Sequence, residues 1–160
     1  MDIFDLEILR FWEALNKNEV LYLMVGGIAT NLHGYQRTTE DIDIWIEDTL
    51  ENRKKIRKAF DDRDMGDFEP LGKNAVYTWL DLFSSQQWNR IHLMDKMKSV
   101  NGELTFSDCY QKASIAEING IKIPFLHINH LLDNKKAVDR PKDRLDVFYL
   151  EKIKELREES

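Results

Sequence analysis

Residues 20–46 of this chain read VLYLMVGGIATNLHGYQRTTEDIDIWI: an apolar run, a glycine pair, a polar interval and a second apolar segment. The six apolar residues 20–25 are typical of a strand buried on both faces. Gly26-Gly27 then ends the strand, and residues 28–32 predict a short helix. Glycine lets the backbone approach a ligand closely, and the free N–H groups at a helix start attract anions. This half of the segment therefore predicts a phosphate site.

The other half, residues 41–46, alternates with a period of two. A strand with that period places Asp41, Asp43 and Trp45 on one face and the three isoleucines on the other. Two carboxylates that converge on one side of a buried strand favour a hard divalent cation. The pair therefore predicts a Mg²⁺ or Mn²⁺ site, and such a metal would hold the phosphates of a nucleotide.

Each motif alone also has an ordinary structural explanation. A Gly-Gly pair is most often only a turn, and Asp-x-Asp is most often a solvated strand end. Here strand, glycine pair, helix, spacer and strand follow one another in order, and the spacer supplies Arg37, Thr38 and Thr39 as candidate phosphate donors. The combination favours a nucleotide site.

With these motifs the chain resembles the DNA polymerase β-like nucleotidyltransferase superfamily. The signature of that superfamily is a hydrophobic residue, Gly-Gly or Gly-Ser, a spacer and Asp-hydrophobic-Asp-hydrophobic, which 25–27 and 41–44 fit. Residues 136–146, KAVDRPKDRLD, are also similar to a run in small bacterial nucleotidyltransferase-like proteins related to type IV abortive-infection toxins. The resemblance covers about residues 20–150. It implies an α/β (α+β) fold, a mixed sheet with helices packed on it.

Active members of the superfamily carry a third carboxylate on a neighbouring strand. The matching segment here is 89–95, and the expected aspartate position falls on His92. Imidazole is a poor ligand for Mg²⁺, but a neutral histidine is a candidate general base. Asp95 has the opposite strand parity and reaches the site only if a bulge re-aims it. A purely structural His92 with a solvated Asp95 is the competing interpretation.

The segment 136–146 has chemistry of its own. Lys136, Arg140 and Lys142 form a basic cluster just before a helix, and such a cluster can bind triphosphate oxygens. By analogy with the toxins, Lys136 and Asp143 are candidates for catalysis and nucleotide binding. The ordinary alternative is a solvated basic turn in which Asp143 stabilises the helix start.

The periodicity along the rest of the chain predicts one domain over residues 1–160, with an N-terminal helix at 2–17, a core at about 20–150 and a C-terminal helix at 141–156. Asn119-Gly120 predicts a hairpin turn, and Pro124 predicts an edge strand. The remaining predictions are helices at 49–62, 106–113 and 128–137, a loop at 61–72, and strands at 75–83 and 89–97.

Composition narrows the classes of function. At 160 residues, with 42% hydrophobic and 32% charged residues, the chain fits a single soluble domain. A net charge of −6 and a pI near 5.3 argue against a general nucleic-acid binder. Cys109 is the only cysteine, no signal peptide pattern is present, and no apolar run is long enough to span a membrane. We therefore expect a cytoplasmic protein that meets small molecules, another protein or its own copy.

The predicted function is metal-dependent transfer of a nucleoside monophosphate from a nucleoside triphosphate to an unidentified acceptor. The alternative is a fold that no longer catalyses and serves as a nucleotide-binding or protein-interaction module, which the replacement at His92 supports. A purely structural or antitoxin-like protein ranks last, because it leaves the paired carboxylates unexplained. Small lincosamide-type nucleotidyltransferases rank below the toxin relatives because their glycine motif is expected to differ. The candidate residues are Gly26, Gly27, Arg37, Thr38, Arg140 and Lys142 for the nucleotide, Asp41 and Asp43 for the metal, and Asp41, Asp43, His92, Lys136 and Asp143 for catalysis.

Overall fold

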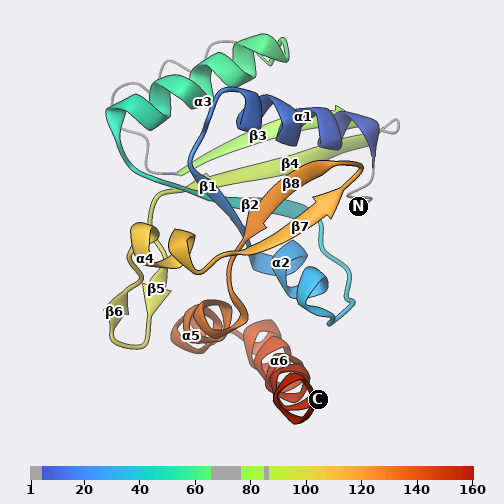
Figure 1. The fold of residues 1–160 in the computed structure, drawn as a ribbon, viewed down its shortest axis with the longest axis vertical. Helices are drawn as coiled ribbons and strands as arrows, with labels where there is room; N and C mark the ends of the chain where they lie inside the picture. The colour runs from blue at the N-terminus through green and yellow to red at the C-terminus, as the bar shows by residue number, and fades with distance from the viewer. Residues whose placement is uncertain (1–4, 66–76, 85–86) are drawn as a thin grey trace.

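The centre of the structure, a computed structural model that describes residues 5–65, 77–84 and 87–160, is a six-stranded sheet in the order β3-β4-β2-β1-β8-β7 (Figure 1). β1 runs antiparallel to β2 and parallel to β8, and β2 runs parallel to β4, so the sheet is mixed, as predicted. β5 and β6 form a separate hairpin. The strands are β1 (Tyr22–Val25), β2 (Asp41–Ile46), β3 (Tyr77–Ser84), β4 (Gln87–Met94), β5 (Lys98–Ser99), β6 (Gly102–Glu103), β7 (Ser114–Ile118) and β8 (Ile121–Phe125).

Helices cover both faces of the sheet. In Figure 1, α1 and α3 lie over one face, whereas α2 lies on the other with α5 and α6 beyond it. Among the described residues no helix is both long and apolar enough to cross a membrane. The helices are α1 (Leu6–Lys17), α2 (Gly26–His33), α3 (Leu50–Asp62), α4 (Phe106–Gln111), α5 (Ile128–Val138) and α6 (Pro141–Glu159).

The core forms where the strand and helix periods present apolar side chains to each other. Ile42 and Ile44 are fully buried under the helix layer, and Trp12 of α1 stacks on Tyr22 of β1 with ring centroids 5.5 Å apart. Burying one side chain of this size contributes roughly 1.5–3 kcal/mol. α1 begins at Leu6 after the N-cap Asp5, so residues 2–4 of its predicted range lie outside the described chain.

Three secondary-structure predictions concern the β7–β8 turn, Pro124 and the segment 61–83. The Asn119-Gly120 turn between β7 and β8 is confirmed, and both residues have positive φ, as a tight hairpin turn requires. Pro124 was wrongly predicted to mark an edge strand, because β8 lies between β1 and β7. Its missing N–H is tolerated there because β8 and β1 share only the Met24–Phe125 pair. The predicted loop at 61–72 and the start of the strand predicted at 75–83 fall partly on residues 66–76, outside the described chain.

The C-terminal helix forms at its predicted position. Its amphipathic spacing is present, but the apolar Leu145, Phe148 and Leu156 are exposed, and Asp143 and Asp146 are buried. Hydrophobic spacing identifies an amphipathic helix but does not say which of two candidate faces meets the core.

A buried histidine joins α2 to the C-terminal helix and predicts acid sensitivity. His33 Nε2 donates to the carbonyl of Leu126 (2.8 Å), and Arg157 Nη1 lies 3.4 Å from His33 Nδ1. Burial lowers the pKa of His33 from its ordinary 6.5, the bond to Leu126 opposes this, and the charges of Arg157 and His127 add to the lowering. Below pH 6.5 the unfolded chain therefore binds a proton before the folded chain does, and stability falls from there towards the lower folded pKa.

We expect the urea midpoint to fall between pH 7 and pH 5, and to fall less in His33→Gln, whose amide can donate to Leu126 but does not titrate. Unfolding curves of both proteins at the two pH values check this. Equal losses would mean that other groups, such as His127, carry the acid sensitivity.

Candidate functional site

The predicted motifs converge on one pocket at the end of β1. It has a volume of about 390 Å³ and lies between the sheet, α5 and the start of α6. Four cationic side chains and two carboxylates line it, which suits an anionic ligand. A larger cavity of about 590 Å³ at the start of β1 contains none of the predicted site residues. The site pocket is lined by Val25, Gly26, Asp43, His92, Met94, Lys96, Met97, Lys98, Asn134, Lys135, Val138, Arg140 and Asp143.

The glycine pair is required by close contacts. Gly26 begins α2 with φ +68°, and a Cβ there would lie 2.2 Å from Asp43 Oδ2. A Cβ at Gly27 would lie 2.6 Å from Thr39 Oγ1. The missing side chains thus let the Asp43 carboxylate pack against the strand-to-helix turn. The two motifs, separated along the chain, form one continuous surface.

Gly26→Ala is therefore expected to displace Asp43 as well as strain the backbone. Gly120→Ala is the matched control, since Gly120 also has positive φ (+79°) but a Cβ there meets no atom within 4 Å in the described chain. We expect each variant to lose about 1–2 kcal/mol from the unfavourable φ, and only Gly26→Ala to lose triphosphate binding as well. Thermal unfolding and calorimetric titration separate the two effects. Equal nucleotide binding by both variants would remove Gly26 from the site.

His92 lies beside Asp43, as the sequence predicted. The parallel register of β2 and β4 pairs Asp43 with His92 and Asp41 with Arg90. His92 Nδ1 and Asp43 Oδ1 are 3.3 Å apart, a long hydrogen bond. The imidazole therefore stands next to the carboxylate in the pocket, and β4 continues to Met94 in the same register.

Asp95 does not replace a third carboxylate. It follows the last residue of β4, does not line the pocket, and its buried Oδ1 has no hydrogen-bond partner in the described part of the chain. Burial raises the pKa of Asp95, and the nearby charge of Asp48 raises it further. No bulge interrupts the register of β2 with β4 from 41 to 45, so the bulge that Asp95 would need to reach the site is absent from these paired residues.

A Mg²⁺ or Mn²⁺ ion fits this site only together with a nucleotide. Over the described ranges, no group of three or more His, Cys, Asp or Glu side chains is placed to hold a metal. Mg²⁺ commonly binds through one or two carboxylates, with substrate phosphates and water as its other ligands. Asp43 at the pocket, with Asp41 two residues away on the same strand, is a donor set of that kind.

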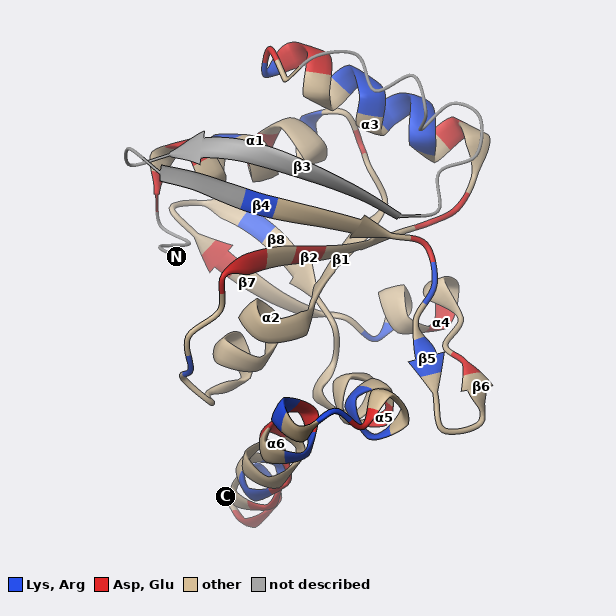
Figure 2. Cartoon of the chain, turned by 180° about the vertical axis from the view of Figure 1, so that it is seen from behind, with Lys and Arg blue, Asp and Glu red and all other residues tan. Residues whose placement is uncertain are grey.

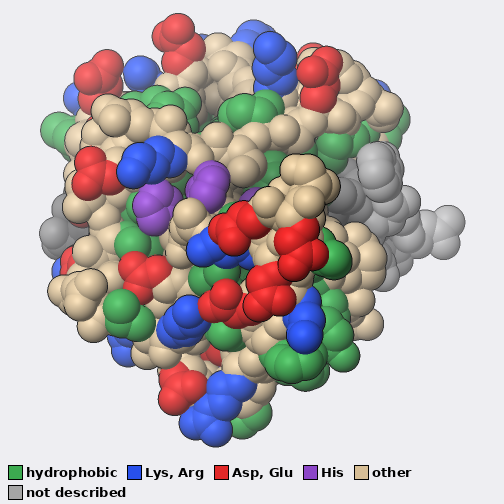
Figure 3. Space-filling view, turned by 60° about the horizontal axis from the view of Figure 1, so that its bottom comes forward, with side chains coloured by type: hydrophobic (Ala, Val, Ile, Leu, Met, Phe, Trp, Pro, Cys, Tyr) green, Lys and Arg blue, Asp and Glu red, His purple; other side chains and the backbone are tan. Residues whose placement is uncertain are grey.

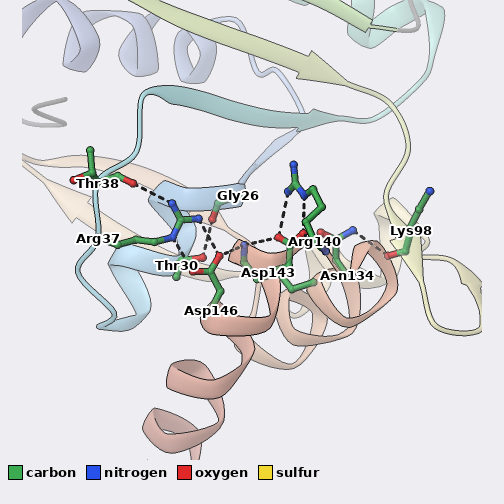
Figure 4. Close-up of polar contacts among 10 residues, drawn as sticks. Gly26, Thr30, Arg37, Thr38, Lys98, Asn134, Arg140, Asp143 and Asp146 are labelled. Atoms are coloured by element: carbon green, nitrogen blue, oxygen red, sulfur yellow. Dashed lines mark hydrogen bonds and ion pairs between the residues drawn. The ribbon is translucent and has the colours of Figure 1, made fainter.

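The start of α6 is held by buried ion pairs (Figure 4). Arg37 donates twice to Asp146, at 2.7 and 2.9 Å, and Lys135 Nζ donates to the same carboxylate at 2.7 Å. Lys135 Nζ also lies 3.6 Å from Asp143, whose Oδ2 accepts 2.6 Å from Arg140 Nε. We call these five residues the buried ion network, after the buried Lys135, Asp143 and Asp146; the Arg140 side chain is 56% exposed. With three cations and two carboxylates it carries one excess positive charge beside the pocket.

The charges of the buried ion network shift the pKa values of its own members. Burial raises the pKa of Asp143, but hydrogen bonds from the Arg140 side chain and backbone, together with the charge of Lys135, outweigh it and hold the pKa below 3.8. The bond to Asp143 raises the pKa of Arg140 against the effect of burial, and the charge of Asp43 raises it further. Arg140 therefore bonds to Asp143 of α6 and lines the same pocket as Asp43 of β2.

Several predicted residues lie elsewhere. Lys136 pairs with Glu151 at 2.7 Å and points away from the pocket. Lys142 is exposed and does not line the pocket. Thr38 is exposed, and its carbonyl accepts from Arg37, whose remaining nitrogens are bound by Asp146. The structure thus brings Gly26, Asp43, His92, Arg140 and Asp143 together at the pocket. The predicted site residues outside its lining are Gly27, Arg37, Thr38, Asp41, Lys136 and Lys142.

Lys135 is the site lysine that the sequence analysis missed. The buried residues of α5 are Ile128, Leu131, Leu132 and Lys135, a spacing of three, four and seven that marks one helix face. The same spacing in the sequence places Lys135, and not its neighbour Lys136, on the inward face. Lys96 and Lys98 at the pocket rim had no comparable signal, because the β5–β6 hairpin that carries Lys98 was not predicted.

No family model and no curated protein matches the sequence. Solved structures do match. The lincosamide antibiotic adenylyltransferase LnuA, lincomycin-bound, superposes with a TM-score of 0.57 and 17% identity over 92% of this chain and 96% of that one. ANT(2")-Ia in complex with adenylyl-2"-tobramycin gives 0.52 and 15% over 94% and 92%.

A third match is an antigenic nucleotidyltransferase-like protein from Paracoccidioides brasiliensis, with a TM-score of 0.51 and 17% identity over 91% of this chain and 76% of that one. At such identities the likeness establishes the fold and leaves the reaction to the site. The predicted fold class is confirmed: the chain has a nucleotidyltransferase fold with a mixed sheet.

Proposed function

We propose that this protein is a metal-dependent nucleotidyltransferase that moves a nucleoside monophosphate from a nucleoside triphosphate to an acceptor. The observation that carries the proposal is the meeting of Gly26, Asp43 and Arg140 at one cationic pocket. A glycine turn at a helix start, a strand carboxylate and an arginine are the groups that a triphosphate and its metal require. The fold that this chain shares with two adenylyltransferases supports the same proposal.

In the transfer, an acceptor oxygen bonds to the α-phosphorus, the bond from that phosphorus to the bridging oxygen breaks, and pyrophosphate leaves. Arg140 and Lys135 border the pocket and stabilise the charge that develops on the leaving group. The proton of an acceptor hydroxyl passes to a base, for which His92 is the candidate, and Asp43 orients the imidazole through its 3.3 Å contact. Asp41 and Asp43 would hold the metal, which when bound supplies charge neutralisation and alignment of the phosphates.

The acceptor is a small molecule, a protein or an RNA. LnuA and ANT(2")-Ia were solved with lincomycin and with adenylyl-2"-tobramycin. The run at 136–146, which resembles that of the abortive-infection toxins, supplies Arg140, Asp143 and Asp146 to the buried ion network. We retain a relation to those toxins, and cytoplasmic action, as part of the proposal.

A second candidate is a nucleotide-binding module without transfer activity. The observation that favours it is the absence of a third carboxylate beside Asp43 in the described chain, where His92 stands and Asp95 lies outside the pocket. Such a module would bind a triphosphate with the same glycines and cations but would not release pyrophosphate.

Calorimetric titration with each nucleoside triphosphate, in Mg²⁺, in Mn²⁺ and in a chelator, tests both candidates. Metal-dependent binding of at least one triphosphate is expected from either. Slow pyrophosphate release on addition of acceptor pools, such as RNA or cell metabolites, would identify the enzyme. Binding without release would select the module, and no binding of any triphosphate would overturn both.

A further inference from the structure

The C-terminal helix α6 has two apolar faces, and only one of them is covered by this chain. Its inner face carries Leu150, which is fully buried. On its outer face Leu145, Phe148, Tyr149 and Leu156 are 51%, 55%, 41% and 66% exposed. They follow one another at intervals of three, one and seven residues, which places them on one side of the helix. We call these four residues the outer stripe.

Isolated exposed hydrophobic residues are ordinary, but a stripe of four on one helix marks a surface that something covers. The described residues of this chain cover only a small part of the outer stripe. Tyr149 stacks on Tyr35 with centroids 4.3 Å apart, and Lys152 Nζ lies 5.5 Å over the ring of Phe148. Both aromatic side chains keep more than two fifths of their surface exposed despite these contacts.

The charges beside the stripe indicate its partner. The start of α6 exposes Lys142 and Arg144, and Arg144 is paired with Asp139. The last turns carry Glu155, Glu158 and Glu159 with Arg157 among them, and Figure 2 shows both signs of charge along the helix. Figure 3 shows acidic, basic and hydrophobic side chains next to one another on this side of the molecule. Two such helices in antiparallel orientation would place Lys142 of each copy beside Glu159 of the other, and their dipoles would oppose. A parallel pair would align like charges.

We propose that the outer stripe of α6 binds the outer stripe of a second copy of this chain, in antiparallel orientation about a two-fold axis. A register centred between residues 150 and 151 places Leu145 beside Leu156 of the other copy and brings the two Phe148 rings towards the middle. A two-fold contact of this kind is self-complementary and closes at a dimer. Because Asp143 and Asp146 lie on the inner face of α6, both pockets stay open in the dimer.

Sedimentation over a range of protein concentrations measures the association. We expect a dimer whose dissociation constant rises at least about tenfold in Phe148→Glu, which places a charge at the centre of the stripe. Ile115→Glu is the matched control, since Ile115 is 57% exposed on β7, away from α6, and its variant should still dimerise. Circular dichroism and thermal unfolding confirm that both variants fold. A monomer at every concentration, or equal weakening by both variants, would overturn the proposal.

Charge exchange tests the orientation. Lys142→Glu should weaken the dimer, and adding Glu159→Lys should restore it, because residues 142 and 159 face each other in this register. A partner protein of another sequence would leave the chain monomeric in these experiments, which would also count against the proposal. A parallel pair would show no such restoration.

Cysteine cross-linking tests the register. Leu145 and Leu156 are eleven residues apart, about 16 Å along the helix. A mixture of Leu145→Cys and Leu156→Cys should therefore form a disulfide-linked dimer that neither variant forms alone. Cys109 does not compete, because it is buried and burial raises its thiol pKa to about 11. Cross-linking of Leu145→Cys to itself would overturn the antiparallel arrangement.

Discussion

Asp43→Asn is expected to lose metal-dependent triphosphate binding while the protein stays folded. The carboxylate is a proposed metal ligand and packs against Gly26 at the pocket. Loss of even an outer-shell partner of a metal ligand costs 10–100-fold in affinity, so we expect a loss of about 100-fold or more in the presence of Mg²⁺ or Mn²⁺. Asparagine has the same shape, so the contact with the glycine turn is kept.

Without metal, Asp43→Asn should no longer weaken the binding of the triphosphate. In a chelator the Asp43 carboxylate repels the triphosphate, and the neutral asparagine should bind it equally well or more tightly. Calorimetry of the variant in both conditions therefore separates a metal ligand from a residue that merely shapes the pocket. Asp139→Asn, the same change at an exposed aspartate paired with Arg144, is the control and should leave binding unchanged. Equal loss with and without metal would remove Asp43 from metal binding.

Asp146→Ala is expected to destabilise the protein by about 3–5 kcal/mol, the typical cost of leaving buried charge unpaired. Asp146 accepts from both Arg37 and Lys135, and the exposed fractions of the Asp146 and Lys135 side chains are 1% and 4%. The substitution would leave Lys135 with only its 3.6 Å contact to Asp143 and would release Arg37, which joins the loop after α2 to α6.

Urea unfolding measures this loss. Asp139→Asn also removes a carboxylate charge from an arginine pair, with Arg144, but on the exposed surface. Asparagine tolerates the left-handed backbone of this residue (φ 56°), so the midpoint should change little. Lys135→Met with Asp146→Leu removes both partners of the buried contact and should recover part of the stability, because an apolar pair leaves less unpaired charge. If Asp146→Ala unfolded like Asp139→Asn, the buried ion network would not hold α6 in place.

The features that could be predicted from sequence are those governed by short-range periodicity. The period of two placed Asp41 and Asp43 on the face opposite the isoleucines, and β2 has that alternation. Strand parity also predicted His92 near Asp43, and the register of β2 and β4 confirms it. These predictions hold because the direction of a side chain on a strand follows from its neighbours in sequence.

Two features depend on which helix faces pack together in the tertiary structure. The spacing of α5 marks Lys135 as inward-facing, but only the tertiary structure shows that this face meets Asp143 and Asp146 at the start of α6, while the adjacent Lys136 pairs with Glu151. The apolar spacing in α6 identifies a helix face, and that face is the exposed outer stripe, whereas Asp143 and Asp146 are buried. An amphipathic pattern defines a face but not the element that covers it.

The sequence by itself determined the order of strands and helices near the site, the glycine turn and the pair of carboxylates, because each follows from backbone preferences over a few residues. The tertiary structure decided which cations reach the pocket, how Asp143 and Asp146 are neutralised, and which face of α6 is left uncovered. These outcomes depend on contacts between residues as far apart as Arg37 and Asp146, which are 109 positions apart in the chain. Local periodicity carries no information about such pairs, since packing between distant segments alone brings them together.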